Sequence, residues 1–477
     1  MLNGGQPQST PSTTSSDHLD TVVIGAGPGG YVAAIRAAEL GQKVTVVEEQ
    51  YLGGVCLNVG CIPSKALVQA GHNLQTAFHS RKMGIHADDV TLDMGQLHQF
   101  KNQTVKTMTD GVASLFRKHH IQVIWGKAAF QSSHHIIVSH DGKQQSYSFN
   151  HAIIATGSRP VALPDIPIKG HVLDSSGALD LEEVPASMVI VGGGYIGCEL
   201  AGAYANFGTR VTILEAQSRI MANFGDDLVQ TVLDDFAHHG VNIMTNARLK
   251  QVSEKAGNVE IGYTIDGQLH SMTVDDVVIA VGRQPNTDQL GLQHAGVMKD
   301  DHGLIEVNNQ CQTNVHNIYA IGDVVAGPAL AHKASYEGKI AAAAIAGHVV
   351  KRQPATIPAV CYVNTPIATT GLTAQQARQQ GFKDVETAKF PFRANGRAVT
   401  MQATQGFVRL VYHGQAKWLV GAQIVGAAAA DLVGELTLAI NSGQTVEDVA
   451  DTIAPHPSLG EAVMDCADLA LGLPINI

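Results

Sequence analysis

The apolar residues of segment 19–49 predict a strand, a glycine-rich turn, a helix and a second buried strand. The turn carries Gly25, Gly27 and Gly30, and Glu48 ends the second strand 23 residues after the first glycine. Glycines in this context let the backbone approach a pyrophosphate at the helix N-terminus, and the acid can accept hydrogen bonds from a ribose. The pattern therefore predicts a dinucleotide-binding unit.

The same order of elements recurs in segment 187–215. Its turn contains Gly192, Gly194 and Gly197, and Glu215 again stands 23 residues after the first glycine. Two copies predict two bound dinucleotides or one very long ligand. An acid at the end of the second strand favours a free ribose 2′-hydroxyl and hence NAD, whereas an NADP site would favour arginine there.

Further buried strands follow each unit. Segment 151–160 has one that ends at Thr156 and Gly157, and segment 275–286, which contains Gly282, mirrors it. Other elements of the first half are predicted as a helix at 96–120 and short strands at 121–124 and 136–138.

Segment 317–345 predicts a strand, a turn at Gly322 and Asp323, and an alanine-rich helix. The turn could contact the phosphate or ribitol of a ligand. Alternatively, Asp323 caps the next helix. The residues alone leave both interpretations open.

From about residue 354 the composition changes, and Pro354 and Pro358 mark a boundary. The remainder alternates strands and helices without a glycine fingerprint, which predicts an α+β domain. The strands are predicted at 360–369, 384–390, 406–412 and 417–425, and the helices at 373–380, 428–442, 446–453 and 458–471.

Segment 53–65 holds two cysteines, Cys56 and Cys61. In a regular helix their Cα atoms would lie about 8–9 Å apart, whereas a disulfide needs about 4.4–6.8 Å. If they bond, Cys56 must lie in a non-helical or distorted turn, for which Gly53 and Gly54 supply the freedom. Two free core cysteines are the alternative, and the spacing suits no zinc knuckle.

Pro63 suits the first turn of a helix, which places Cys61 at or just before a helix N-terminus. The helix dipole favours a thiolate there. Near the C-terminus, His456 stands between two prolines, and Glu461 follows five residues later. These two residues could form an oriented acid–base pair, although a helix-capping or buried polar histidine is commoner.

The composition limits the possible classes of protein. A chain of 477 residues is expected to form two to four domains. The net charge of −11, without a basic cluster, argues against nucleic acid as a partner. No apolar run is long enough to predict a membrane span. Six sparse cysteines favour a reducing compartment, and residues 1–18, rich in Ser, Thr and Pro, predict a disordered tail without a transit-peptide pattern.

The chain resembles the class I flavin disulfide reductases in the motifs that it carries and in their order. These motifs are the GGVCLNVGCIPSKAL segment, the glycine fingerprints, the ATG and VGRQPN strand ends, the GDV turn with ALAHKA, and HPSLGE. The resemblance covers about residues 19–472. It implies an α/β fold with two Rossmann-like dinucleotide-binding domains, for FAD and NAD, and a C-terminal α+β dimerisation domain. The implied domains are an FAD-binding domain at 19–157, an NAD-binding domain at 158–284, a central domain completing the FAD site at 285–353 and an interface domain at 354–477, after the tail at 1–18.

The resemblance also implies roles for single residues. FAD contacts are implied for Gly25, Gly27, Gly30, Glu48, Thr156, Gly157, Asp323, Ala331 and His332, and NAD contacts for Gly192, Gly194, Gly197, Glu215 and Gly282. Lys65 and Glu199 correspond to the ion pair beside the flavin ring, so Lys65 is also a cofactor contact. Cys61 resembles the thiolate that faces the flavin, and Cys56 the interchange thiol that meets the substrate. His456 and Glu461 match an acid–base pair contributed by the partner subunit, and no metal role is implied.

Within the family, the chain is most similar to the branch that reoxidises dihydrolipoamide, carried on lipoyl domains, through a redox-active disulfide and FAD, with NAD+ as the acceptor. The implied protein is a cytoplasmic homodimer that binds the E2 core, or its peripheral-subunit-binding domain, of a 2-oxo acid dehydrogenase complex.

Three alternatives fit the sequence less well. Glutathione reductase-like enzymes usually have basic residues at Glu215 and lysine at Ser64, and mercuric reductase-like enzymes need another cysteine pair near the C-terminus. A non-catalytic flavoprotein subunit would not need the intact cysteine and His–Glu pairs. One departure is Ile367, where the family commonly has an acid, although Tyr362 still matches.

Overall fold

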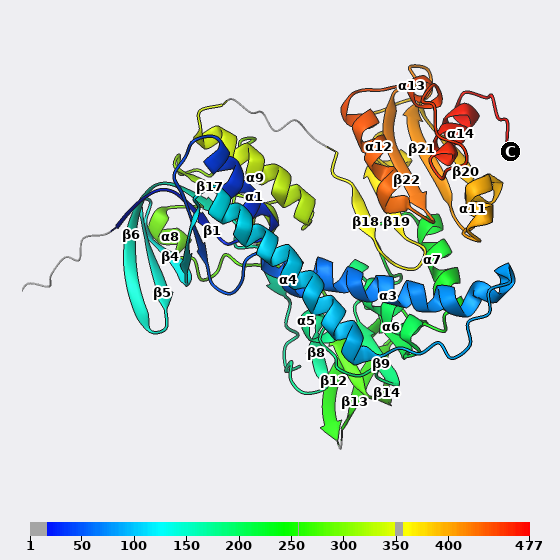
Figure 1. The fold of residues 1–477 in the computed structure, drawn as a ribbon, viewed down its shortest axis with the longest axis horizontal. Helices are drawn as coiled ribbons and strands as arrows, with labels where there is room; N and C mark the ends of the chain where they lie inside the picture. Colours follow the sequence, from blue (N-terminus) through cyan, green and yellow to red (C-terminus); the bar gives the residue numbers. More distant parts are fainter. Residues whose placement is uncertain (1–16, 256, 349–355) are drawn as a thin grey trace, which may run out of the picture. The chain divides into compact units, whose positions relative to one another are not determined.

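The computed structural model describes residues 17–255, 257–348 and 356–477, which form two compact units (Figure 1). The first unit comprises the described residues up to Gly54 and segments 111–158 and 285–348; the second comprises segments 55–110, 159–284 and 356–477. The chain passes between the units after Gly54 and within α4 (Met94–Lys118), β7 (Ser158–Pro160) and β16 (Arg283–Pro285).

The start of the fold differs slightly from the prediction. The predicted tail lies outside the described residues as far as residue 16, and so does Pro354. Strand β1 begins at Asp17, two residues before the expected start at Leu19. The ladder with β6 explains this extension, because Asp17 and His18 are already paired with Tyr147 and Ser148.

The first unit is built on a seven-stranded sheet in the order β3-β2-β1-β6-β5-β4, with β17 paired to β6. Its strands are β1 (Asp17–Ile24), β2 (Val44–Glu48), β3 (Gln122–Trp125), β4 (Lys127–Ser132), β5 (His135–His140), β6 (Lys143–Ile154) and β17 (Ile318–Ala320). Its helices are α1 (Pro28–Glu39), α8 (Leu292–Ala295), α9 (Ala331–Ile345) and the 3₁₀ turn η2 (Gly322–Val324). The β3-β2-β1-β6-β17 part is parallel, so the carboxyl ends of β1 and β6 lie at one edge, as a nucleotide-binding sheet requires.

The second unit repeats this arrangement in a parallel sheet of order β11-β10-β9-β15-β8. Its strands are β8 (Val172–Asp174), β9 (Ser187–Val191), β10 (Arg210–Leu214), β11 (Asn242–Met244) and β15 (Asp276–Ile279), with a separate antiparallel sheet of β12 (Ala247–Lys255), β13 (Asn258–Ile265) and β14 (Gln268–Val274). Its helices are α2 (Gly54–Val59), α3 (Cys61–His79), η1 (Ser80–Met83), α5 (Ser175–Ala178), α6 (Tyr195–Phe207) and α7 (Asp226–His238).

The C-terminal part of the second unit is an antiparallel sheet of order β18-β19-β22-β21-β20. Its strands are β18 (Ala359–Cys361), β19 (Ile367–Gly371), β20 (Val385–Pro391), β21 (Phe407–His413) and β22 (Leu419–Val425). Its helices are α10 (Ala374–Gln379), η3 (Phe392–Ala394), α11 (Gly396–Thr400), α12 (Ala429–Asn441), α13 (Val446–Ala450) and α14 (Glu461–Ala470).

The prediction of a single strand at 360–369 is wrong. The chain reverses between β18 and β19, which pair with each other as a hairpin. Pro366, which has no N–H to donate, lies at the end of the intervening loop, and Tyr362 lies at its start. Ile367 opens β19 and is fully buried, so an apolar side chain suits this position.

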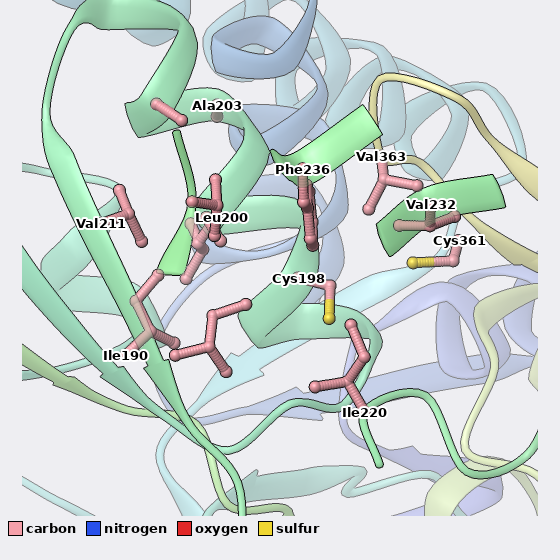
Figure 2. Packing of buried hydrophobic residues seen from close by; sticks show 14 of the residues in the cluster. Ile190, Cys198, Leu200, Ala203, Val211, Ile220, Val232, Phe236, Cys361 and Val363 are labelled. Carbon is pink, nitrogen blue, oxygen red and sulfur yellow. The ribbon is translucent and has the colours of Figure 1, made fainter. Parts of the chain in front are cut away.

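One hydrophobic cluster joins the α/β and C-terminal parts of the second unit (Figure 2). Ile190 of β9 and Cys198 of α6 belong to the same cluster as Phe236 of α7 and Cys361 of β18. All four side chains are fully buried. Their burial removes apolar surface from water and so fixes α6 against the loop that contains Tyr362.

Candidate functional site

Cys56 and Cys61 lie on two successive helices. Cys56 is in α2 and both cysteines are free thiols, so the structure does not have the non-helical or distorted turn that a bonded Cys56 would require. The chain breaks instead at Gly60, whose φ and ψ are −142° and −112°, and Cys61 begins α3. Gly53 and Gly54 do have positive φ values, of 88° and 58°. The short helix α2 and the longer helix α3 meet at this break, which brings together thiols that one regular helix would hold apart.

The two thiols differ in their acidity. A hydrogen bond between the two side chains is the largest influence on both. This bond lowers the pKa of Cys61 to about 7, and the positive charge of Lys65 acts in the same direction against the effect of burial. The same bond, together with burial, raises the pKa of Cys56 above its usual value. The arrangement therefore favours a thiolate on Cys61 and a thiol on Cys56.

Lys65 lies one turn further along α3 and pairs with Glu199 of α6. The Lys65 Nζ to Glu199 Oε2 distance is 2.6 Å, and Glu199 is only 5% exposed. The Tyr362 backbone N–H donates to Glu199 Oε1 at 2.9 Å, and the Tyr362 ring centroid lies 4.5 Å from Lys65 Nζ. Tyr362 thus contacts both members of the pair. These contacts of Tyr362 were not predicted, because they depend on the reversal of the chain after β18.

The first glycine turn, in the first unit, has the features expected of a dinucleotide site. A Cβ atom on Gly25 would lie 2.4 Å from the Ala155 carbonyl oxygen. A Cβ atom on Gly30 would lie 1.9 Å from the Gly25 carbonyl oxygen. These two glycines are needed for close packing. Among the described residues, a Cβ on Gly27 would meet nothing nearer than 3.9 Å, and no side chain caps the N-terminus of α1. Open space beside uncapped N–H groups fits a pyrophosphate.

The second glycine turn, in the second unit, repeats this geometry. A Cβ on Gly192 would lie 2.4 Å from the Ala280 carbonyl oxygen. A Cβ on Gly197 would lie 2.0 Å from the Gly192 carbonyl oxygen. In the part of the chain that the structure describes, a Cβ on Gly194 would meet nothing within 4 Å, and no side chain caps the N-terminus of α6. Both turns therefore fit bound dinucleotides.

The two acids at the strand ends each accept a hydrogen bond from the backbone of the glycine turn in the same unit. Glu48 Oε2 accepts from the Ala26 N–H, and Glu215 Oε2 from the Gly193 N–H, each at 2.7 Å. An ionised carboxylate has about four lone-pair sites. Glu48 Oε1 also accepts from two backbone N–H groups of the following turn, and Glu215 Oε1 accepts from one. About one acceptor site therefore remains on Glu48, and about two remain on Glu215, for a ribose hydroxyl. Gly282, at the turn after β15, has a φ of 142°.

The remaining residues expected at the FAD site lie in the first unit. Thr156 donates from Oγ1 to the Asn286 carbonyl at 2.8 Å, and Gly157 has a φ of 66°. Asp323 accepts at Oδ2 from the Ser158 hydroxyl at 2.6 Å. Leu330, not Asp323, precedes α9, which excludes the helix-capping interpretation. Ala331 and His332 lie in the first turn of α9, and no side chain of the described residues caps the N-terminus of this helix.

His456 and Glu461 form a pair at the start of α14. Glu461 Oε1 lies 2.7 Å from His456 Nδ1, and its Oε2 accepts from the Ser458 N–H at 2.7 Å. Both hydrogen bonds lower the pKa of Glu461, and the bond from the Ser458 N–H has the larger effect. The His456 side chain is 81% exposed, so its other ring nitrogen faces outward from this chain. Within the described residues, the polar contacts of the pair stay inside segment 456–461 and do not reach the cysteines.

Comparison with protein families gives two matches. Residues 19–338 match the pyridine nucleotide-disulphide oxidoreductase family, and residues 357–467 match its dimerisation domain. Within the described part of the chain, no helix is long and apolar enough to cross a membrane. The same residues contain no cluster of His, Cys, Asp or Glu suited to a metal ion.

Individual proteins resemble the chain over almost its full length. It is 50% identical to dihydrolipoyl dehydrogenase of Geobacillus stearothermophilus over 96% of this chain and 97% of that relative. It is 43% identical to the enzyme of the same name from Halobacterium salinarum, over 97% of this chain and 98% of that relative. Among solved structures, LpdA of Mycobacterium tuberculosis matches with a TM-score of 0.88 and 25% identity, over 94% of this chain and 99% of that one. The flavoprotein disulfide reductase RclA of Escherichia coli matches with a TM-score of 0.85 and 27% identity, over 95% and 99%.

Proposed function

Because the chain belongs to the pyridine nucleotide-disulphide oxidoreductase family, we propose that it is a dihydrolipoyl dehydrogenase, which oxidises dihydrolipoamide to lipoamide with NAD+ as the acceptor. The observation that carries this proposal is the asymmetric pair of Cys56 and Cys61 beside Lys65. The Cys56 sulfur is suited to attack by a substrate thiolate, and the Cys61 sulfur is suited to leave as a thiolate. FAD held by the first unit would supply an acceptor for the electron pair of the reduced cysteines and a hydride donor to NAD+.

The chain's own residues supply the thiol chemistry. His456 takes a proton from one thiol of the substrate, and Glu461 orients the imidazole and stabilises its positive charge. The resulting thiolate attacks the Cys56 sulfur of the oxidised pair. A substrate–Cys56 disulfide forms, the Cys56–Cys61 bond breaks, and Cys61 leaves as a thiolate held by Lys65.

The second substrate thiol completes the exchange. This thiol loses its proton to solvent, and its thiolate attacks the substrate sulfur that is bound to Cys56, which closes the lipoamide ring and releases Cys56 as a thiolate. Cys56 then takes a proton from His456 and becomes a thiol. Its raised pKa favours this protonated form. Two electrons now reside on the pair, ready to be passed on.

The wider arrangement is also a proposal. FAD binds the first unit at Gly25, Gly27, Gly30, Glu48, Thr156, Gly157, Asp323, Ala331 and His332, and NAD binds the second at Gly192, Gly194, Gly197, Glu215 and Gly282. The exposure of His456 supports a homodimer in which it serves the cysteines of the other subunit. Lipoyl domains of a 2-oxo acid dehydrogenase complex carry the substrate, the E2 core is the binding partner, and the protein is cytoplasmic.

Steady-state kinetics test this proposal. The purified protein is expected to form NADH from dihydrolipoamide and NAD+, and to work poorly with NADP+, because the Glu215 carboxylate repels a 2′-phosphate. Oxidised glutathione and mercuric ion, each supplied with NADH or NADPH as the electron donor, serve as competing substrates. Preference for either of them, or for NADP+, would contradict the proposal.

A further inference from the structure

The charged side chains of Lys333 and Glu337, one turn apart on α9, are both fully buried. Lys333 Nζ lies 3.3 Å from Glu337 Oε2. Removing two charges from water is costly, and attraction between them offsets that cost only when additional hydrogen bonds satisfy both groups. Neither residue takes part in the thiol chemistry described above. The contacts that satisfy the pair therefore indicate its purpose.

Both charged groups bind to the same residue, Gly322. Lys333 Nζ donates to the Gly322 carbonyl at 2.9 Å, and Glu337 Oε2 accepts from the Gly322 N–H at 2.8 Å. Gly322 has a φ of 77°, a conformation that residues with side chains rarely adopt. The pair thus fixes the backbone on both sides of this Cα atom.

Asp323 follows Gly322 directly within η2, and the orientation of its side chain depends on the Gly322 backbone. Its carboxylate accepts a hydrogen bond from Ser158, which leaves further acceptor sites on both oxygens. We propose that Lys333 and Glu337 are positioning residues that fix the Gly322 backbone and thereby hold the Asp323 carboxylate in place for FAD. This inference rests on the proposed FAD site of the first unit.

A structural role for the pair gives a different expectation. If it only attached α9 to the sheet, its loss would lower stability without depending on Asp323. Replacing a buried ion pair with apolar residues of similar volume is often neutral or stabilising. The double variant K333M/E337M is therefore expected to fold, and the dependence on Asp323 can be measured.

The test is a double-mutant cycle on FAD affinity, measured by titrating each apoprotein with FAD and following flavin fluorescence. K333M/E337M is expected to raise the dissociation constant by about tenfold or more, but by less than about twofold when D323A is also present. The control K339M, which changes an exposed lysine of α9, is expected to leave the affinity unchanged.

An unchanged affinity in K333M/E337M, or an equal loss with and without D323A, would overturn the inference. If the double variant does not fold, E337Q takes its place in the cycle, because its amide keeps an acceptor for the Gly322 N–H while the charge is lost. E337Q is expected to lose less FAD affinity than K333M/E337M, and this loss is again expected to disappear when D323A is also present. If the parent chain itself bound no FAD, the proposed function would fail instead, so the two failures are distinguishable.

Discussion

Cys56 and Cys61 carry the same side chain, yet their surroundings give them opposite protonation near neutral pH. The hydrogen bond between them and the charge of Lys65 place the pKa of Cys61 at about 7. The thiolate of Cys61 therefore appears as the pH rises through about 7 rather than through the ordinary value of 9.0. Cys56 stays protonated over this range.

The first prediction concerns this titration. In the reduced protein, the rate of alkylation of Cys61 by iodoacetamide is expected to rise with a midpoint near pH 7. K65M removes a nearby positive charge and is expected to move the midpoint upward by about one pH unit. Peptide mass spectrometry identifies the alkylated cysteine. Reaction at Cys56 first, or a midpoint that K65M does not move, would contradict the assigned asymmetry.

Tyr362 allows a second prediction at this scale. Its ring faces the Lys65 ammonium, and its backbone N–H holds Glu199. Y362L removes the ring but keeps the N–H, and is expected to slow alkylation of Cys61 at pH 7 by about threefold, which is the size of a weak cation–π contact. Y362F keeps the ring and is expected to match the parent. An effect as large in Y362F as in Y362L would assign the role to the hydroxyl group.

At the scale of the element, each glycine turn combines glycines that permit packing with one that leaves room for a ligand. The third prediction compares two alanine variants of the second turn. G197A is expected to lower the free energy of unfolding by about 1–3 kcal/mol or more, because its Cβ would lie 2.0 Å from the Gly192 carbonyl oxygen. G194A is expected to change the free energy of unfolding by less than about 0.5 kcal/mol, since its Cβ would meet no atom of the described residues within 4 Å.

G194A is nevertheless expected to raise the KM for NAD+, because the methyl group would occupy space meant for the pyrophosphate. Urea denaturation and steady-state kinetics measure the two effects separately. Comparable destabilisation by both variants, or an unchanged KM in G194A, would contradict the division of roles between these glycines.

At the scale of the whole molecule, His456 is expected to act on the cysteines of the other subunit. The fourth prediction uses a heterodimer of one C56S chain and one H456Q chain, isolated by two affinity tags after co-expression. Each homodimer is expected to be nearly inactive with dihydrolipoamide. The heterodimer has one intact site and is expected to recover about half of the parent activity. A heterodimer as inactive as both homodimers would place His456 and the cysteines in one subunit.

Much of this molecule could be predicted from the sequence, and what escaped prediction has a common physical cause. The glycine turns and Cys61 at a helix N-terminus follow from local rules of backbone conformation. The break at Gly60, the reversal after Cys361 and the contacts of Lys333 with Gly322 depend on residues distant in the sequence or on packing. Local periodicity carries no record of such contacts, so the strand predicted at 360–369 ran through the loop that contains Tyr362.

The most direct measurement of the central claim is NADH formation from dihydrolipoamide and NAD+ by the parent, C56S and C466A. Cys466 of α14 is a fully buried thiol in a hydrophobic cluster with Phe390 of β20 and Leu410 of β21, and it serves as the control. C56S is expected to retain FAD yet lose activity by a factor of about 10³ or more, because no disulfide can form, while C466A stays close to the parent. Turnover by C56S within about twofold of the parent would contradict the claim that electrons pass through Cys56 and Cys61.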